Sequence, residues 1–91
     1  MPEENDQSLP NLQELRNRID ALDEQIVALL NSRAQVVVEI GQLKQQNNVP
    51  IYAPDREKVI MDKVRRLNRG PLQDRSLEAV YRELRSGTFA L

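Results

Sequence analysis

The sequence predicts an all-α protomer of three helices, the first of them very long, that pairs with a copy of itself. Its 91 residues include only 3% aromatic but 30% charged residues, with abundant Leu, Val, Ile, Glu, Arg and Gln, a composition that favours helices over sheets. Apolar residues recur at alternating spacings of three and four over about 35 residues, which is typical of a helix with a packing seam. A chain this short builds only a small core, and oligomerisation commonly compensates for that.

The first helix has a clear start and a sustained apolar pattern. Residues 1–10, MPEENDQSLP, are polar and acidic, and we expect them to be disordered ahead of a single domain over 11–91. Asn11 followed by Glu14 is a variant of the capping box, which marks a helix start. What we call the apolar seam comprises Leu12, Leu15, Ile19, Leu22, Ile26, Leu29, Arg33, Val36, Ile40 and Leu43.

The length of this helix predicts the dimer. About 35 residues at 1.5 Å per residue give a rod of roughly 50 Å, whereas a compact chain of this size has a radius of gyration of about 12 Å. The seam must therefore be buried against another chain, most simply a second copy. Gly41 is the one weak point of the helix; it costs roughly 1 kcal/mol relative to alanine, which suggests close packing at that residue.

Two shorter helices follow. Pro54–Leu67 is predicted as the second, because proline suits the first helical position and acidic residues suit the first turn. Gly70-Pro71 ends it, and a third helix begins near Asp74 and reaches about Thr88. Their apolar stripes are Val59, Ile60, Val64 and Leu67 in the second helix and Leu77, Val80, Tyr81 and Leu84 in the third.

Composition excludes several classes of function. The net charge of −1 gives no overall field for nucleic acid or an anionic membrane. The absence of cysteine and histidine removes thiolate chemistry, the usual catalytic triads and the commonest metal ligand, and we predict no metal and no cofactor. No apolar run reaches transmembrane length and the first ten residues do not resemble a signal peptide, so a cytoplasmic location is expected.

Arg33 stands where the apolar seam calls for an aliphatic residue. It is either a polar residue that fixes register, with its head turned out of the seam, or an anion-binding residue facing a cavity. Lys44 follows eleven residues later, which is three turns plus about 20°, so the two cations share a face roughly 16 Å apart. Arg16 is rotated about 100° from that face and would serve the site of a partner chain instead.

The stretch PDRE adds two more candidates at the start of the second helix. Arg56 and Glu57 are either ordinary charges of a first turn or site residues that point back to the first helix, and their spacing leaves both interpretations open. Several cations and one carboxylate, without a nucleophile or a strong base, suit the binding of a small polycarboxylate and the stabilisation of separating charge.

These stretches resemble one known family. LRNRIDALDEQIVALLNSRAQVVVEIGQLK, then PIYAPDRE, then GPL and VYRELRSG are similar to the helical (AroQ-type) chorismate mutases, in particular to domains fused to prephenate dehydratase or DAHP synthase. The resemblance implies an intertwined homodimer that converts chorismate to prephenate by a Claisen rearrangement in aromatic amino-acid biosynthesis. The rearrangement needs no proton transfer, which fits a chain without histidine or cysteine.

The resemblance also implies roles for individual residues. Arg16 would bind a substrate carboxylate in the partner's site and Arg33 a carboxylate in its own. Lys44 would lie near the ether oxygen and a carboxylate. At the second helix, Arg56 would support the carboxylate region and Glu57 would accept a hydrogen bond from the ring hydroxyl.

Three departures from the family pattern are visible. Ala53 replaces an aspartate of some members, which leaves only its backbone amide for the substrate, and Thr88 replaces a serine. The family's Gln or Glu near the ether oxygen would fall one residue after Leu91. Either the natural chain continues past Leu91 and supplies this residue, or the protein lacks it. The second case favours an alternative function, a low-activity regulatory domain that binds chorismate or prephenate for a fused or partner enzyme. A purely structural helical dimer, with Arg33 as its register device, is a further alternative.

Overall fold

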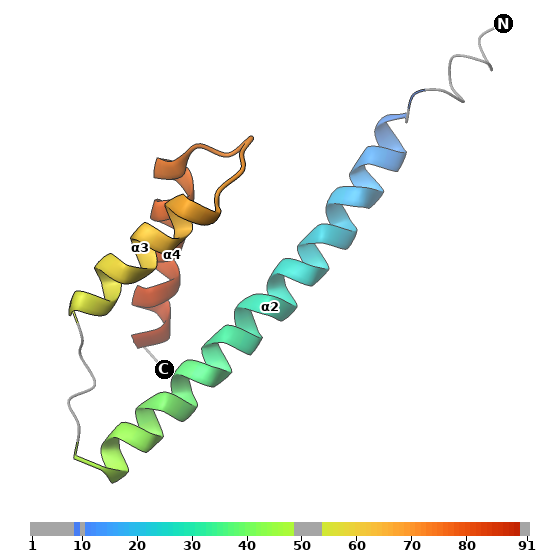
Figure 1. Ribbon diagram of the computed structural model, residues 1–91. Coiled ribbons are helices and arrows are strands. Elements are labelled where there is room, and N and C mark those ends of the chain that lie inside the picture. Colours follow the sequence, from blue (N-terminus) through green and yellow to red (C-terminus); the bar gives the residue numbers. More distant parts are fainter. Residues whose placement is uncertain (1–8, 10, 49–53, 90–91) are drawn as a thin grey trace, which may run out of the picture. The chain divides into compact units, whose positions relative to one another are not determined.

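Helices make up nearly all of the described chain. The computed structural model describes residue 9 and residues 11–48 and 54–89, and within these ranges it forms α2 (Leu12–Gln46), α3 (Pro54–Leu67) and α4 (Asp74–Phe89) with no strand (Figure 1). The predicted all-α, three-helix chain with a very long first helix is confirmed. The predictions for residues 1–8 and 10 and for Ala53 lie outside the described residues. None of the helices in the described ranges is long and apolar enough to cross a membrane.

The start of α2 is set by the predicted cap. The Oδ1 atom of Asn11 accepts a hydrogen bond of 2.8 Å from the backbone N–H of Glu14. Such a bond satisfies one of the amide groups that the first turn of a helix leaves unpaired. Glu14 also places a negative charge in the first turn, where the helix dipole favours it.

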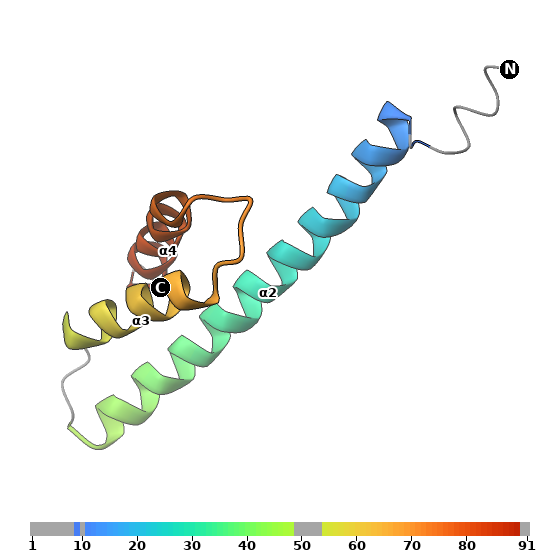
Figure 2. The same cartoon turned by 45° about the horizontal axis from the view of Figure 1, so that its top comes forward.

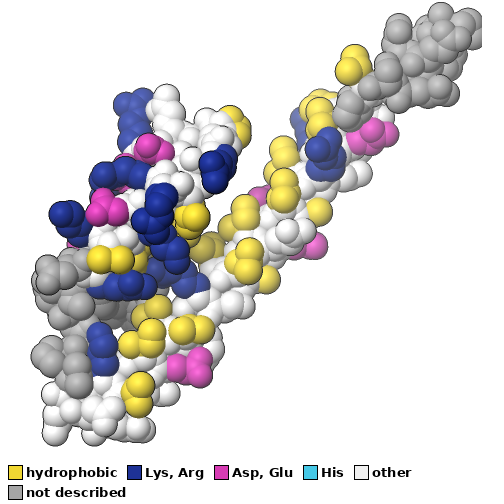
Figure 3. Space-filling view, viewed as in Figure 1, with side chains coloured by type: hydrophobic (Ala, Val, Ile, Leu, Met, Phe, Trp, Pro, Cys, Tyr) yellow, Lys and Arg dark blue, Asp and Glu magenta, His cyan; other side chains and the backbone are white. Residues whose placement is uncertain are grey.

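The apolar seam is exposed over the whole length of α2. No residue of α2 is buried among the described atoms, and the side chain of Leu29 is 68% exposed. Figure 3 shows hydrophobic side chains following this helix along its surface. The exposed members of the seam are Leu12, Leu15, Ile19, Leu22, Ile26, Leu29, Val36, Ile40 and Leu43. The helix therefore presents an unburied apolar surface about 50 Å long.

A second face of α2 is half-buried. It lies about 110° around the helix from the seam in the same stretch, at 100° per residue. By helical rotation Arg33 lies at the border of the two faces. The half-buried residues are Leu30, Arg33, Ala34, Val37, Val38, Gly41 and Lys44.

The helices α3 and α4 pack side by side as an antiparallel pair, here called the hairpin (Figures 1 and 2). Its core consists of Ile60, Met61 and Val64, each less than a tenth exposed. From α4, Leu77, Tyr81 and Leu84 contribute half-buried side chains at helical spacing. The apolar stripes predicted for the two helices thus find partners in each other only in part, because Val59, Leu67 and Val80 remain at least half exposed.

One asparagine organises the loop of the hairpin. The Nδ2 atom of Asn68 donates to the carbonyl oxygen of Leu72 (2.8 Å) and to Oδ1 of Asp74 (2.7 Å). Its Oδ1 atom accepts from the N–H of Gly70 at 2.9 Å. Gly70 has a φ of +70°, in the left-handed region that glycine occupies without strain. The predicted stop of the second helix at Gly70-Pro71 is therefore built around Asn68 as well.

An ion pair joins the two helices of the hairpin. The Nε and Nη2 atoms of Arg65 donate to Oε1 of Glu78 at 3.0 and 2.9 Å. The side chain of Glu78 is only 13% exposed, whereas that of Arg65 is 53% exposed and also approaches Asp62 at 3.6 Å. The hydrogen bond and charge of Glu78 raise the pKa of the Arg65 guanidinium above its ordinary value. This pair links the last turn of α3 to the second turn of α4.

Candidate active site

Three of the predicted site cations lie on α2. Arg33 and Lys44 are both half-buried, on the same face, as the rotation of the helix predicts. Arg16 is exposed and lies about 100° around the helix from Arg33. The half-burial matters because a cation partly withdrawn from water interacts more strongly with an anion than one on an open surface.

Three further candidates lie at the open end of the hairpin. Arg56 and Glu57 are exposed in the first turn of α3, and Thr88 is half-buried in the last turn of α4. Counting from the Arg65–Glu78 ion pair, Glu57 is about 12 Å along α3 and Thr88 about 15 Å along α4. The antiparallel hairpin therefore brings these residues, far apart in sequence, to the same end.

The hydroxyl of Thr88 already has a partner. Its Oγ1 atom donates to the carbonyl oxygen of Leu84 at 2.6 Å. A threonine hydroxyl has one hydrogen to donate and two lone pairs. In this conformation Thr88 offers a ligand an acceptor, and donating to a ligand would require its side chain to rotate.

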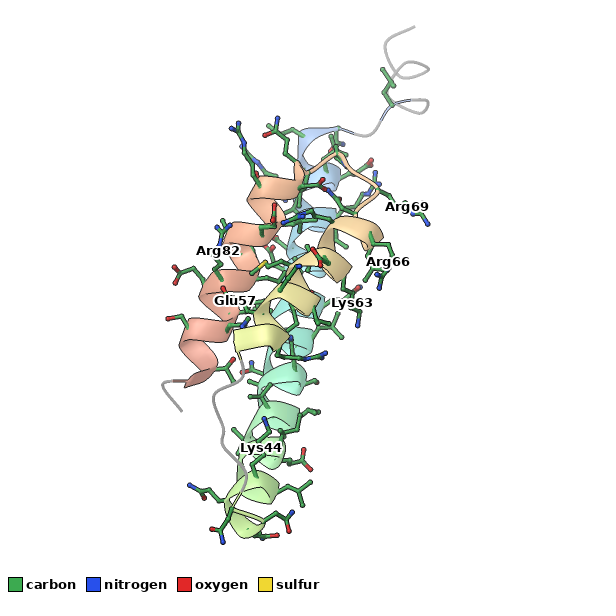
Figure 4. The ribbon with its side chains drawn as sticks, turned by 60° about the vertical axis from the view of Figure 1, so that its left-hand side comes forward. Lys44, Glu57, Lys63, Arg66, Arg69 and Arg82 are labelled. Atoms are coloured by element: carbon green, nitrogen blue, oxygen red, sulfur yellow. The ribbon has the colours of Figure 1, made fainter. Side chains whose placement is uncertain are left out.

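The surface of the hairpin is rich in cations. Pro54–Phe89 contains nine Lys and Arg against six Asp and Glu, although the whole chain has a net charge of −1. Figure 4 shows Lys63, Arg66 and Arg69 on the side of α3 away from α4, and Figure 3 shows Lys and Arg gathered over the two helices. The local field of the hairpin therefore favours an anionic ligand more than the overall charge indicates.

A shallow apolar hollow lies at the other end of the hairpin. Its volume is about 270 Å³, and it holds none of the predicted site residues. Its lining consists of Val64, Leu67, Asn68, Arg69, Leu77 and Tyr81. A separate search for metal ligands finds no group of three or more acidic side chains, among the described residues, that could hold a metal ion.

The residues that align the hairpin were not predicted from the sequence. In the sequence, Arg65 is one of several cations near the end of the second helix, and nothing singles out Glu78 or Asn68. Arg65 and Glu78 are thirteen residues apart, so their pairing becomes visible only once α4 is aligned against α3. A signal was present in Asn68, since asparagine before a glycine-proline turn commonly hydrogen-bonds the nearby backbone.

Comparison with known proteins identifies the family. The sequence profile described as "Chorismate mutase type II" matches residues 15–91, which includes every candidate on the three helices. The chain belongs to the type II chorismate mutase family. The resemblance predicted from the sequence is thereby confirmed.

Relatives of known name agree with this assignment. The chain is 40% identical over 87 residues to a bifunctional chorismate mutase/prephenate dehydratase of Aquifex aeolicus, an alignment that covers 91% of this chain and 24% of the relative. It is 36% identical over 59 residues to a chorismate mutase of Methanocaldococcus jannaschii, covering 65% of this chain and 60% of that one. The chain thus spans about a quarter of the length of its bifunctional relative.

A solved structure agrees with the fold. The chorismate mutase of Thermus thermophilus in its form II superposes with a TM-score of 0.85 at 30% sequence identity. The match covers 88% of this chain and 91% of that chain. Chorismate mutases therefore share both the sequence pattern and the helical fold described above.

Proposed function

We propose that this chain is a chorismate mutase, an isomerase that rearranges chorismate to prephenate. The observation that carries the proposal is the pair of half-buried cations Arg33 and Lys44, three turns apart on one face of α2, in a chain of this family. Chorismate is a dicarboxylate, and two cations on one face match its charge. The rearrangement itself requires no cofactor.

The proposed mechanism is electrostatic. As the carbon–oxygen bond of the ether breaks and a new carbon–carbon bond forms, negative charge develops on the oxygen. Lys44, which also contacts a carboxylate, stabilises this charge. Arg33 binds a carboxylate and holds the reactive conformer, which removes part of the entropic barrier. Glu57 accepts the hydrogen bond of the ring hydroxyl, and Arg56 supports the carboxylate region. The backbone amide of Ala53 and the hydroxyl of Thr88 complete the contacts.

We propose that the working form is an intertwined homodimer. The exposed apolar seam of α2 supports this, because an apolar surface about 50 Å long is unfavourable in water. Arg16, which lies off the Arg33 face, would then bind a carboxylate in the site of the second copy. The bifunctional relatives further support a prephenate dehydratase as the fused or neighbouring enzyme.

We also propose that the protein acts in the cytoplasm.

Loss of chorismate, followed by absorbance, tests the function directly. We expect saturable turnover by the wild-type chain, and a fall in kcat/KM of at least ~100-fold for Arg33→Leu with the dimer intact. Arg66→Leu is the matched control, an equal change on the outer face of α3, and should be close to wild type. Wild-type binding of prephenate without turnover would establish the regulatory alternative. A changed oligomeric state for Arg33→Leu would establish the register alternative.

Mixed dimers test the position of Arg16. Arg16→Ala and Arg33→Ala subunits should each be nearly inactive alone. Mixed in equal amounts, they form hybrid dimers in which one of the two sites contains both native residues, so part of the activity should return. If hybrid dimers form and activity stays at background, Arg16 does not act across the subunits.

A further inference from the structure

Arg18 and Glu39 occupy equivalent places beside the apolar seam of α2. Each comes one residue before a seam residue, Ile19 in one case and Ile40 in the other, so both border the same edge of the seam. Both side chains are exposed, and neither forms an ion pair within the described parts of the chain. At Glu39 this edge lies on the opposite side of the seam from the half-buried face. The two charges are therefore open to a second chain that packs on the seam.

The apolar seam matches itself when a second copy of α2 runs in the opposite direction. Its spacings of three and four read the same from both ends, so an antiparallel copy sets Leu12 against the partner's Leu43 and Arg33 against the partner's Leu22. All ten seam positions then have an opposite number. We call this arrangement the full-overlap register. A shift by one seven-residue repeat in either direction leaves two seam residues of each chain uncovered.

The full-overlap register brings Arg18 beside Glu39 of the partner subunit. In this register the two Cα atoms differ in height by about two residues, or roughly 3 Å, and they lie on the same edge of the interface. Two-fold symmetry forms the contact twice. Charged pairs at the edges of a helical seam commonly determine the orientation of the two helices. Opposite charges thus meet where the chain by itself leaves both exposed.

Other arrangements of the two helices place like charges against each other. A parallel copy sets Arg33 against the partner's Arg33 inside the seam. An antiparallel copy shifted by one repeat sets either Arg16 against the partner's Lys44 or Asp23 against the partner's Asp23, depending on the direction of the shift. Repulsion between like charges disfavours all three arrangements. The charges beside the seam therefore favour the full-overlap register over its competitors.

We propose that Arg18 and Glu39 are a positioning pair, which joins two copies of α2 in the antiparallel, full-overlap register. This inference rests on the proposed function and its homodimer. The register also brings Arg16 level with residue 39 of the partner, about midway along the axis between the partner's Arg33 and Lys44. Arg16 lies on the edge of the seam that meets the half-buried face of the partner. The pair therefore sets the height at which Arg16 enters the site of the second copy.

Mixing two variants of opposite charge tests the pair. Arg18→Glu and Glu39→Arg each bring like charges together in their own homodimers, whereas a heterodimer of the two makes both contacts attractive. After equimolar mixing and re-equilibration, native mass spectrometry should find clearly more heterodimer than the statistical share of about half. The excess should shrink at ~1 M salt. The control is Arg18→Glu mixed with Glu24→Arg, an equal change on the exposed side of α2 away from the seam, which should give the statistical share.

The double variant Arg18→Glu/Glu39→Arg tests rescue within one chain. Each single variant should raise the dissociation constant of the dimer by about 10-fold at low salt, measured by sedimentation equilibrium. At protein concentrations near that constant, kcat/KM for chorismate should fall with the dimer. The double variant should regain both values, and Glu24→Arg alone should match wild type.

Several outcomes overturn the inference. In a parallel dimer Arg18 faces the partner's Asp23 and Glu39 faces the partner's Lys44, so the exchange would give neither a heterodimer preference nor rescue. A monomeric wild type refutes the dimer and the pair together. An active, dimeric wild type without heterodimer preference refutes the pair alone, whereas a clear preference in a chain that does not turn over chorismate refutes only the proposed function. If a variant alone does not fold, recovery of helicity on mixing gives the same comparison.

Discussion

The hairpin and α2 differ in the burial of their apolar side chains. The hairpin buries Ile60, Met61 and Val64 between its own two helices and aligns them with a cross-helix ion pair. In contrast, α2 buries none of its residues among the described atoms and exposes every aliphatic residue of its apolar seam. One region holds a small core within the chain, and the other leaves its apolar side chains exposed among the described residues. In the proposed dimer the stability of α2 comes mostly from association, because propensity alone gives helices only marginal stability in water.

Placing a charge in the apolar seam should have the largest effect on this difference. Ile26→Glu puts a carboxylate into the proposed interface, where an unpaired buried charge costs about 3–5 kcal/mol. We expect the dimer to dissociate in sedimentation experiments and α2 to lose helicity with it. Ala28→Glu adds the same charge on the opposite, exposed side of α2 and should leave the dimer intact. A dimeric Ile26→Glu protein would show that the seam is not the interface.

Truncation inside the hairpin should have the next largest effect. Ile60 is 8% exposed, and Ile60→Ala should lower the free energy of unfolding by about 2–5 kcal/mol because it leaves a cavity. Its neighbour Val59 is 51% exposed, and Val59→Ala should cost about 0.5 kcal/mol or less. Urea unfolding of the two variants measures both values. Equal losses would mean that Val59 is buried in the assembled protein.

Removal of the helix cap should have a smaller effect. Asn11→Ala deletes the 2.8 Å hydrogen bond to the N–H of Glu14 and should cost about 1 kcal/mol. The loss should be confined to the first turn of α2, which amide hydrogen exchange resolves residue by residue. Asn17→Ala removes a side-chain contact with Gln13 but no cap, and serves as the control. Unchanged exchange in Asn11→Ala would contradict the assigned role of the cap.

Breaking the ion pair of the hairpin should have the smallest effect. Arg65→Met, Glu78→Gln and the double variant form a cycle that isolates the pair from other contacts. We expect a slightly lower thermal midpoint for each single variant, a difference that shrinks at high salt because Arg65 is exposed. Arg66→Met is the control, because Arg66 lies on the side of α3 away from α4.

The pH response of this pair follows from the pKa shift. The pKa of Arg65 is raised in the folded state, so the charged guanidinium stabilises the folded protein at any pH below the ordinary arginine pKa. This stabilisation is lost only when the pH rises through the raised pKa. The contribution of the Arg65 guanidinium should therefore be constant through the neutral range. A loss of this contribution near neutral pH would contradict the assignment.

The sequence predicted the features that depend on neighbours along the chain. Asn11 and Pro54 mark the starts of α2 and α3 by local chemistry, and the Gly70-Pro71 turn follows the end of α3, as the structure confirms. The shared face of Arg33 and Lys44 followed from helical rotation alone. The split of α2 into an exposed seam and a half-buried face was not predicted, because both faces carry aliphatic residues and the sequence does not show which one the chain covers.

Features that depend on the alignment of one helix against another lay beyond such reasoning. Glu78 is a charged residue like its neighbours until α4 is placed beside α3, and only then does its carboxylate meet Arg65. The approach of Glu57 and Thr88 to one end of the hairpin depends on the same alignment. For the roles of the site residues, the family resemblance supplied what helical geometry could not.

The loop of the hairpin depends on the identity of one atom. The Nδ2 nitrogen of Asn68 donates to two oxygens, those of Leu72 and Asp74. Aspartate has almost the same shape as asparagine, but its carboxylate has no hydrogen to donate. It would therefore lose both hydrogen bonds and add a negative charge beside Asp74. Spontaneous deamidation of Asn68 would make this exchange without any mutation. The loop between the two helices is thus open to chemical ageing at a single amide, which mass spectrometry of a stored sample would reveal as a gain of about one dalton.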